Sequence, residues 1–189
     1  MPNAQQKWDK RYAAKGDLSE CTSKPPEFLV RNLDQLKRGR VLDLAAGDGA
    51  VSLYLAEQGF EVVAVEISQV GLDRLETRLS NKGFKCDTAV IDLESTGADL
   101  SALGEFDSIV ISRYKPVSDL WAGLASITKT DGHILLTTFN TQHHQRTGFS
   151  QRFCLAPNEI QNVDDALEVI LQESDRDSSG MDSYLYKKV

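Results

Sequence analysis

Short hydrophobic runs alternate with longer amphipathic stretches from residue 41 onward. Runs of this kind, rich in valine, leucine and isoleucine, are typical of strands that are covered on both faces. The stretches between them carry apolar residues at helical spacing, most clearly Val117, Leu120, Trp121, Leu124 and Ile127, which must lie against a sheet. This pattern predicts strands at 41–44, 62–65, 86–91, 109–111 and 134–138, and helices at about 49–58, 69–81 and 117–128.

Two helices are predicted before the first strand. The spacing of Trp8, Arg11 and Tyr12 places these side chains on one side of a short helix. A proline in the first turn favours the start of the second helix. The predicted elements are a helix at 5–15 and a helix from Pro26 that carries Leu29, Leu33 and Leu36.

The end of the chain departs from the alternating pattern. A polar loop is predicted at 140–150, followed by a short helix near 157–163. Two further runs, 167–173 and 183–188, are joined by the turn-rich stretch SDRDSSGMD. This arrangement predicts an antiparallel pair that closes one edge of the sheet.

Alternating strands and helices are the signature of right-handed βαβ units. We therefore predict an α/β fold of Rossmann-like type, with a mostly parallel sheet of about seven strands, an antiparallel last strand, and helices on both faces. The length suits a single domain over residues 1–189, in which residues 1–40 form an N-terminal helical segment covering the site.

Charge and composition narrow the class of protein. The chain has a net charge of −7, which repels phosphate backbones, so we expect no nucleic-acid partner. Neither a long apolar run nor a signal-peptide pattern is present, so we expect a cytoplasmic protein with no membrane partner. Cys21, Cys86 and Cys154 are far apart and form no CxxC, which predicts neither a disulfide framework nor a metal site.

Residues 41–68, VLDLAAGDGAVSLYLAEQGFEVVAVEIS, predict a strand, a glycine turn, a helix and a second strand ending in Glu66. Such a turn lets the backbone approach a ligand, and the helix that follows presents free N–H groups. Nicotinamide dinucleotides and S-adenosylmethionine are both bound in this way. The dinucleotide pattern GxGxxG is incomplete here because Ser52 takes the place of its third glycine, after Gly47 and Gly49.

Asp43 helps to distinguish the two cofactors. A carboxylate just before the turn repels a pyrophosphate by several kcal/mol on a Coulomb estimate. It suits S-adenosylmethionine, which carries an ammonium and a sulfonium group. Glu66 can accept ribose hydroxyl protons from either cofactor. Asp43 and Ser52 therefore favour S-adenosylmethionine, and an NAD(P)-dependent reductase is the alternative.

The sequence resembles the class I S-adenosylmethionine-dependent methyltransferases over nearly its whole length. The resemblance is carried by VLDLAAGDG, VVAVEIS, AVIDLES and FDSIVISRY. More narrowly, WDKRY, PPEFLVRNL and RFCLAPNEI are similar to the small bacterial subgroup related to tellurite-resistance (TehB-like) methyltransferases. One departure is that Ala45 and Ala46 stand where the family commonly has glycine or cysteine.

The resemblance implies a role for each residue of these motifs. Asp43 would orient the methionine end of S-adenosylmethionine, Glu66 would hold the ribose, and Asp92 would accept from the adenine amino group. As structural alternatives, Asp43 caps a backbone N–H and Asp92 starts a turn. The remaining implied cofactor contacts are Gly47 and Gly49 beneath the cofactor, Ile67 as an apolar wall for adenine, Ala45, Leu93, and a lid of Trp8, Arg11 and Tyr12. A helix packed on the sheet is the alternative for the last three residues.

The sequence motifs say less about the methyl acceptor than about the cofactor. Methyl transfer from a sulfonium requires alignment and a dry site more than acid–base groups, so no motif has to identify the acceptor. Arg113 and Tyr114 follow the fourth strand, where a ligand crevice is expected, and we predict that they meet the acceptor. The SRYKP stretch lacks the acid or asparagine and the two prolines found in amino-group methyltransferases that act on adenine or glutamine.

His143, His144 and Arg146 follow the fifth predicted strand. Adjacent histidines without a third ligand rarely bind a metal, so we predict no metal, and either an acceptor-facing or a merely exposed loop. Taken together, the sequence predicts transfer of a methyl group to a small-molecule or small-anion acceptor by a monomer or homodimer. The remaining alternatives are the reductase and a non-catalytic S-adenosylmethionine-binding protein.

Overall fold

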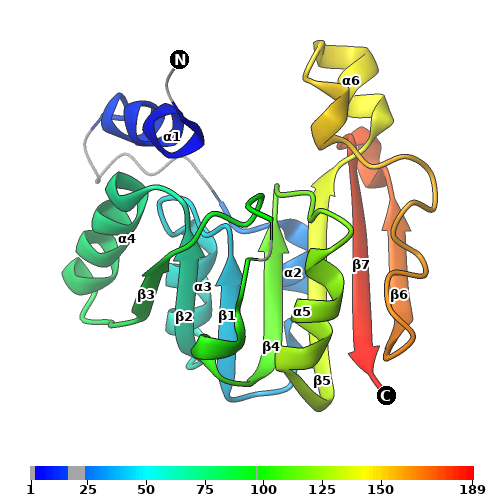
Figure 1. The fold of residues 1–189 in the computed structure, drawn as a ribbon, viewed down its shortest axis with the longest axis horizontal. Helices are drawn as coiled ribbons and strands as arrows, with labels where there is room; N and C mark the ends of the chain where they lie inside the picture. The colour runs from blue at the N-terminus through cyan, green and yellow to red at the C-terminus, as the bar shows by residue number, and fades with distance from the viewer. Residues whose placement is uncertain (1–2, 17–23, 97) are drawn as a thin grey trace.

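The computed structural model describes residues 3–16, 24–96 and 98–189. Its centre is a seven-stranded sheet in the order β3-β2-β1-β4-β5-β7-β6, in which β7 runs antiparallel to both of its neighbours (Figure 1). The predicted mostly parallel sheet with an antiparallel last strand is confirmed. The strands are β1 (Arg40–Leu44), β2 (Glu61–Glu66), β3 (Asp87–Val90), β4 (Phe106–Ser112), β5 (Thr128–Phe139), β6 (Leu167–Ser174) and β7 (Met181–Lys188).

Helices lie on both faces of the sheet, as predicted (Figure 1). One buried layer joins side chains of α2, α3 and α4 to Val41, Val110 and Leu135 of the strands. The other joins α5 and the segment around Leu155 and Ile160 to the opposite face. The helices are α1 (Ala4–Ala13), α2 (Glu27–Arg31), α3 (Ala50–Glu57), α4 (Gln69–Asn81), α5 (Leu120–Ile127) and α6 (Thr141–Thr147).

The sheet topology places one edge of the molecule in position to bind a ligand. β1 pairs in parallel with β2 on one side and with β4 on the other, so the strand order reverses next to β1. In open α/β sheets, ligands bind outside the carboxyl ends of the strands at such a switch point. The residues that follow β1, β2, β3 and β4 therefore share the edge at which a site is expected.

The predicted helix from Pro26 is shorter than expected. α2 ends at Arg31, and a 3₁₀ turn follows at Leu33–Gln35. The helix ends at its C-cap Asn32, whose φ of −113° and ψ of 17° depart from helical values, although both its N–H (3.1 Å) and its side chain (2.9 Å) donate to the carbonyl of Phe28. Leu29, Leu33 and Leu36 are nevertheless all buried, so the apolar spacing identified the core contacts correctly.

The predicted helix at 117–128 begins three residues late. α5 starts at Leu120, so Val117 precedes the helix and is 41% exposed. The other members of the apolar stripe, Leu120, Trp121, Leu124 and Ile127, are buried against the sheet.

Two predictions near the C-terminus were wrong. The segment predicted as a polar loop at 140–150 contains α6, which Asn140 caps by accepting from the N–H groups of Gln142 and His143, and which ends at Gly148 with a φ of 71°. The helix predicted near 157–163 is a series of turns, and Asn158 adopts a φ of 61°, which interrupts a right-handed helix. α6 has no apolar stripe, so only its capping residues signal it.

Within the described ranges, none of the helices is both long and apolar enough to cross a bilayer. Cys86 and Cys154 are free thiols, whereas Cys21 lies outside the described residues.

Candidate functional site

A left-handed turn links β1 to α3 at the switch point. Gly47 and Gly49 have φ values of 60° and 86°. A Cβ on Gly49 would lie 2.5 Å from Cγ of Leu75, so no larger residue fits there. Ala45 also has a positive φ, of 59°, a strained conformation for a residue with a Cβ. This is the position at which the sequence departs from the glycine or cysteine common in the resembled family.

Asp43 is buried at the carboxyl end of β1, with 1% of its surface exposed. Its carboxylate accepts a hydrogen bond from Ser52 Oγ of α3 (2.6 Å). Burial raises the pKa of Asp43 to about 7, although the bonds from Ser52 partly oppose this rise. Ser52, which in the sequence only takes the place of the third glycine of the dinucleotide pattern, is therefore the direct partner of the acid.

Glu66 ends β2 and is buried beside the same turn. Its carboxylate accepts from three backbone N–H groups, those of Gly47 (2.9 Å), Ile67 (3.0 Å) and Ser68 (3.1 Å). Burial raises its pKa, and these three bonds limit the rise. A carboxylate has about four lone-pair sites, so about one is left for a ligand hydroxyl in this geometry.

Asp48 lies inside the glycine turn and was not singled out from the sequence. It forms an ion pair with Lys15 (2.9 Å), and the guanidinium of the buried Arg78 donates to its carbonyl (2.5 Å) and reaches its carboxylate (3.5 Å). Burial would raise the pKa of Asp48, but the hydrogen bond from Lys15 and the charges of Lys15 and Arg78 hold it below its usual value. Arg78 therefore ties the turn to α4.

α1 lies over this turn rather than on a face of the sheet (Figure 1). Tyr12 is buried, and a Cβ on Gly47 would lie 2.8 Å from its hydroxyl oxygen. Burial raises the pKa of Tyr12, and the carboxylates of Glu66 and Asp48 add to this effect. Trp8 stacks on Tyr12 with the ring centroids 5.9 Å apart. The alternative of a helix packed on the sheet is therefore wrong.

A cavity of about 260 Å³ lies next to the N-terminal end of α1. Two predicted residues, Ile67 and Asp92, line it. Asp92 is exposed and accepts from the N–H of Glu94 (3.0 Å), which is the turn-starting contact considered as its structural role. Leu93 does not line this cavity, because its side chain is buried in the core layer that includes α5. The other lining residues are Asn3, Ala4, Gln5 and Val90.

Arg113 and Tyr114 follow β4 at the same edge. Arg113 has an exposed side chain and a φ of 56°, and its N–H donates to the carbonyl of Thr137 (2.8 Å). The hydroxyl of Tyr114 is buried without a hydrogen-bond partner among the described residues. Burial raises the pKa of Tyr114, and the nearby carboxylates of Glu94 and Asp92 raise it further.

α6 uses its polar residues for structural contacts. His143 stacks on Phe139 at 4.3 Å between centroids, and Nδ1 of His144 donates to the carbonyl of Phe149 (2.6 Å). Arg146 pairs with Asp175 (3.0 Å). No group of three or more potential metal ligands occurs in the part of the chain that the structure describes.

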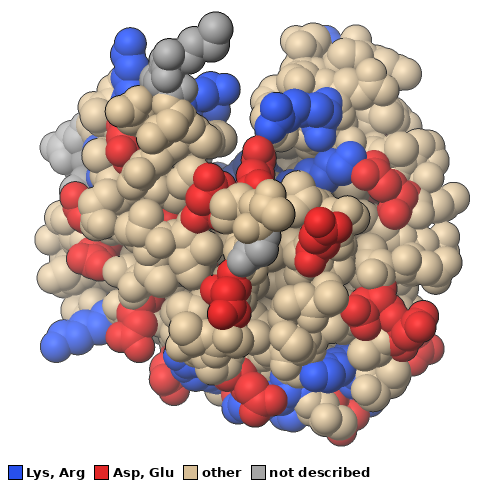
Figure 2. Space-filling view, in the orientation of Figure 1, with Lys and Arg blue, Asp and Glu red and all other residues tan. Residues whose placement is uncertain are grey.

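Figure 2 shows a cleft between the part of the molecule topped by α1 and the part topped by α6, with basic side chains on its α6 side and acidic ones toward its floor. Two ion pairs connect segments at this end of the sheet. Arg152 pairs with Glu94 (2.9 Å), and Lys115, just after β4, pairs with Glu159 (2.6 Å). The cleft thus lies at the carboxyl ends of the parallel strands, where the sheet topology predicts a ligand.

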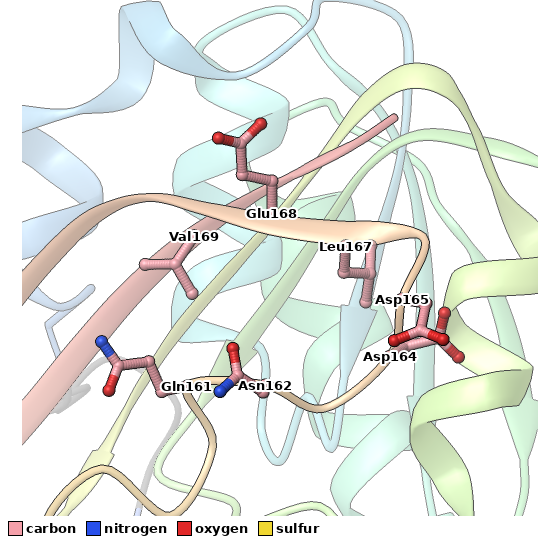
Figure 3. A pocket seen from close by; sticks show the side chains of 7 residues that line it. All are labelled: Gln161, Asn162, Asp164, Asp165, Leu167, Glu168 and Val169. Carbon is pink, nitrogen blue, oxygen red and sulfur yellow. The ribbon is translucent and has the colours of Figure 1, made fainter.

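A larger cavity, of about 480 Å³, lies elsewhere, beside the start of the edge strand β6 (Figure 3). Asp164, Asp165 and Glu168 line it, but Figure 3 shows the carboxylate of Glu168 apart from the other two. β6 starts where β7 ends, at the end of the sheet opposite the glycine turn. Size therefore does not identify the functional site in this molecule.

Comparisons with known proteins agree with this geometry. A family model described as a methyltransferase domain matches residues 41–132. The cypemycin N-terminal methyltransferase of Streptomyces sp. is 32% identical over 125 residues, which cover 62% of this chain and 49% of that protein. The chain spans less than half the length of the curated relatives that it matches.

Solved structures share the fold. One, reported for the conversion of a disulfide bond into a thioacetal group during echinomycin biosynthesis, superposes with a TM-score of 0.77 at 12% identity over 98% of this chain and 92% of that one. TehB from Haemophilus influenzae gives a TM-score of 0.71 at 17% identity over 96% and 67%. At these identities the likeness shows the fold alone, and TehB is one neighbour among diverse proteins.

Proposed function

We propose that this chain is an S-adenosylmethionine-dependent methyltransferase of the class I fold that transfers the methyl group of its cofactor to a small molecule or small anion. One observation carries the proposal: two buried carboxylates, Asp43 and Glu66, flank a glycine turn at the strand-order switch point. Together they suit a ligand with a cationic amino-acid end and a ribose, and they disfavour the diphosphate that the reductase alternative requires.

The residues present fit this cofactor. Asp43 lies at the carboxyl end of β1, where an ionised carboxylate would attract the ammonium of the methionine end. The remaining lone pair of Glu66 would accept from a ribose hydroxyl. The 260 Å³ cavity bounded by Ile67 and Asp92 is of a size that suits the adenine rather than the whole cofactor. Gly47 and Gly49 would pack beneath the ligand.

The cofactor supplies an activated methyl group on a sulfonium, and the protein aligns it with the acceptor and excludes water. Tyr12 of α1 already lies against the turn and Trp8 stacks on Tyr12, so the two would act as the lid over the bound cofactor. The acceptor would enter from the cleft (Figure 2). Arg113 and Tyr114, whose hydroxyl has no hydrogen-bond partner among the described residues, follow β4 at the same edge of the sheet.

The acceptor is proposed to be small and anionic because of Arg113. A positive φ is costly for arginine, so the exposed guanidinium at this edge points to a function rather than to backbone preference. We expect Arg113→Met to raise the Michaelis constant for an anionic acceptor and to leave cofactor affinity unchanged. Lys85→Met, which removes an exposed cation elsewhere, serves as the control.

Calorimetry tests the cofactor. We expect micromolar binding of S-adenosylhomocysteine and no binding of NAD or NADP, and the reverse result would support a reductase instead. A screen of small thiols, selenite and tellurite for S-adenosylhomocysteine release then tests for turnover. Binding of the cofactor without turnover of any acceptor would favour the non-catalytic alternative.

A further inference from the structure

The cavity next to α1 is formed by two parts of the chain that are far apart in sequence. Ile67 and Asp92 come from the ends of the β2 and β3 segments, whereas Asn3, Ala4 and Gln5 come from the first turn of α1. A base bound between Ile67 and Asp92 would therefore have α1 as a further wall. The motifs of the glycine turn give no indication of this contribution.

Gln5 is the residue of that wall whose side-chain amide is wholly free of hydrogen bonds among the described residues, whereas Oδ1 of Asn3 accepts from the N–H of Gln6 (2.8 Å). Its neighbour Gln6 is engaged in a capping box, in which its Oε1 accepts from the N–H of Asn3 (3.2 Å). Gln5 is half-buried although it lies in a terminal turn, and its side-chain amide has no hydrogen-bond partner among the described residues. An amide in that state offers two donors and one acceptor to the cavity.

Asp92 supplies the complementary group. It uses one carboxylate oxygen to accept from Glu94 N–H, which leaves lone pairs for a further donor. The six-position edge of adenine presents an amino donor beside ring-nitrogen acceptors, and glutamine pairs with that edge through its amide. An acid that accepts from the amino group and an amide that donates to the adjacent ring nitrogen would together match adenine and mismatch hypoxanthine.

We propose that Gln5 is a specificity-determining residue that recognises the adenine of the cofactor across this cavity, opposite Ile67 and together with Asp92. The proposal rests on the proposed function, because it requires an adenine-containing cofactor. It makes the first turn of α1 part of the binding site and not only a cover.

Contacts elsewhere along α1 hold Gln5 in place. Asp9 accepts from Ser68 Oγ (2.6 Å), at the N-cap of α4. Lys15, just after the helix, pairs with Asp48 in the glycine turn (2.9 Å). Because α1 is attached both along its length and beyond its end, the position of its first turn relative to Asp92 is defined by the fold.

The test uses two variants of Gln5 and calorimetric titration of the full chain with S-adenosylhomocysteine and with S-inosylhomocysteine, in which the amino group of the base is replaced by oxygen. Gln5→Ala removes the amide. Gln5→Glu keeps its size and removes its donors, while an acid in the first turn favours the helix. Lys10→Ala, an exposed position on the same helix, is the matched control.

We expect both Gln5 variants to bind S-adenosylhomocysteine about 3- to 10-fold more weakly than wild type, as for loss of one hydrogen bond. The preference of the wild type for the adenosyl over the inosyl ligand should shrink by the same factor, and Lys10→Ala should change neither value. Melting temperatures without ligand should agree among all four proteins, which shows that the fold is intact.

The proposal would be overturned if Gln5→Glu bound S-adenosylhomocysteine with wild-type affinity. It would also be overturned if the variants lost affinity equally for the adenosyl and inosyl ligands, because α1 would then act only as a cover. If the wild type binds neither ligand, the proposed function itself fails and this inference fails with it. Binding of S-adenosylhomocysteine by the wild type with no effect of either variant refutes Gln5 alone.

Discussion

Glu66 has a structural role and a proposed ligand-binding role at the glycine turn. Its carboxylate holds three backbone N–H groups in place and has about one acceptor site left for a ligand. The sequence predicts that this acid accepts ribose hydroxyl protons, and only the structure shows how much of its hydrogen-bonding capacity the turn already uses. A substitution here should therefore affect binding and stability together.

We expect Glu66→Gln to weaken S-adenosylhomocysteine binding by about 1–3 kcal/mol and to lower the free energy of unfolding by a similar amount, because the amide places an N–H₂ group against a backbone donor. Calorimetry and urea denaturation measure the two effects. Glu61→Gln, at the exposed start of the same strand, should change neither quantity. Unchanged ligand affinity in Glu66→Gln would refute the role given to Glu66.

Asp43 makes binding and stability depend on pH in opposite directions. Its pKa is raised by burial from 3.8 to about 7. Between these values the folded chain holds a proton that the unfolded chain has released, so its contribution to stability is full below pH 4 and is lost as the pH rises through 7. Attraction of the ligand ammonium requires the ionised form, so affinity should rise over the same upper range.

We therefore expect S-adenosylhomocysteine affinity to increase from pH 6 to pH 8 while the stability contribution of Asp43 to the ligand-free protein decreases from pH 4 to pH 7. Titrations at three pH values and thermal melts measure both trends. Asp43→Asn should flatten each of them, whereas Asp34→Asn, at an exposed position, should not. An affinity that is the same at pH 6 and pH 8 would contradict this interpretation.

At the scale of elements, α1 is the helix whose position matters most for the site. Asp9 attaches α1 to α4, because its carboxylate accepts a hydrogen bond from Ser68 Oγ and a longer one from the N–H of Val70 (3.4 Å). Arg74 of α4 donates to the carbonyl of Gly16 (3.0 Å). These contacts join segments about 60 residues apart in the chain, so they place a local helix over a distant turn.

We expect Asp9→Ala to weaken S-adenosylhomocysteine binding about 5- to 30-fold, because α1 loses a charge-assisted contact that holds it closed. The turnover number at saturating cofactor should stay unchanged. Trypsin should cleave the ligand-free variant faster at Lys7, Lys10 and Arg11. Asp34→Ala is the control, and a cleavage rate equal to wild type would show that Asp9 does not hold the helix.

The elements also show where sequence patterns are informative. Apolar periodicity identified α3, α4 and the central strands, because these elements bury a regular stripe or run. The edge strands β3 and β6 were also predicted, although they are only partly buried. α6 was missed because it buries no stripe and depends on Asn140 and Gly148 at its ends. α2 ends earlier than predicted because the backbone of Asn32, its C-cap, departs from helical dihedral angles.

At the scale of the whole molecule, the net charge of −7 opposes nucleic-acid binding. Basic side chains are present at the α6 side of the cleft, but acidic ones lie close to them (Figure 2). Arg152 and Lys115 are paired with Glu94 and Glu159, so their charges are largely offset. The molecule therefore offers no extended basic surface in this view.

We expect ribosomal and transfer RNA fragments to bind with dissociation constants weaker than about 0.1 mM at 0.15 M salt. Fluorescence anisotropy measures this, with S-adenosylhomocysteine present so that the lid is occupied. A basic RNA-binding domain of similar size is the positive control. Micromolar binding that weakens steeply with added salt would contradict a small-molecule acceptor.

By itself, the sequence determined the strand order along the chain, the glycine turn, and the two acids Asp43 and Glu66, because burial patterns and turn chemistry are local properties. Only the tertiary structure decided that Ser52 is the partner of Asp43, that Arg78 and Lys15 hold Asp48, and that Gln5 shares a cavity with Asp92. Except for Asp43 and Ser52, which are close in sequence, the residues of these pairs are 30 or more positions apart. Their geometry therefore exists only once the helices have packed at the carboxyl edge of the sheet.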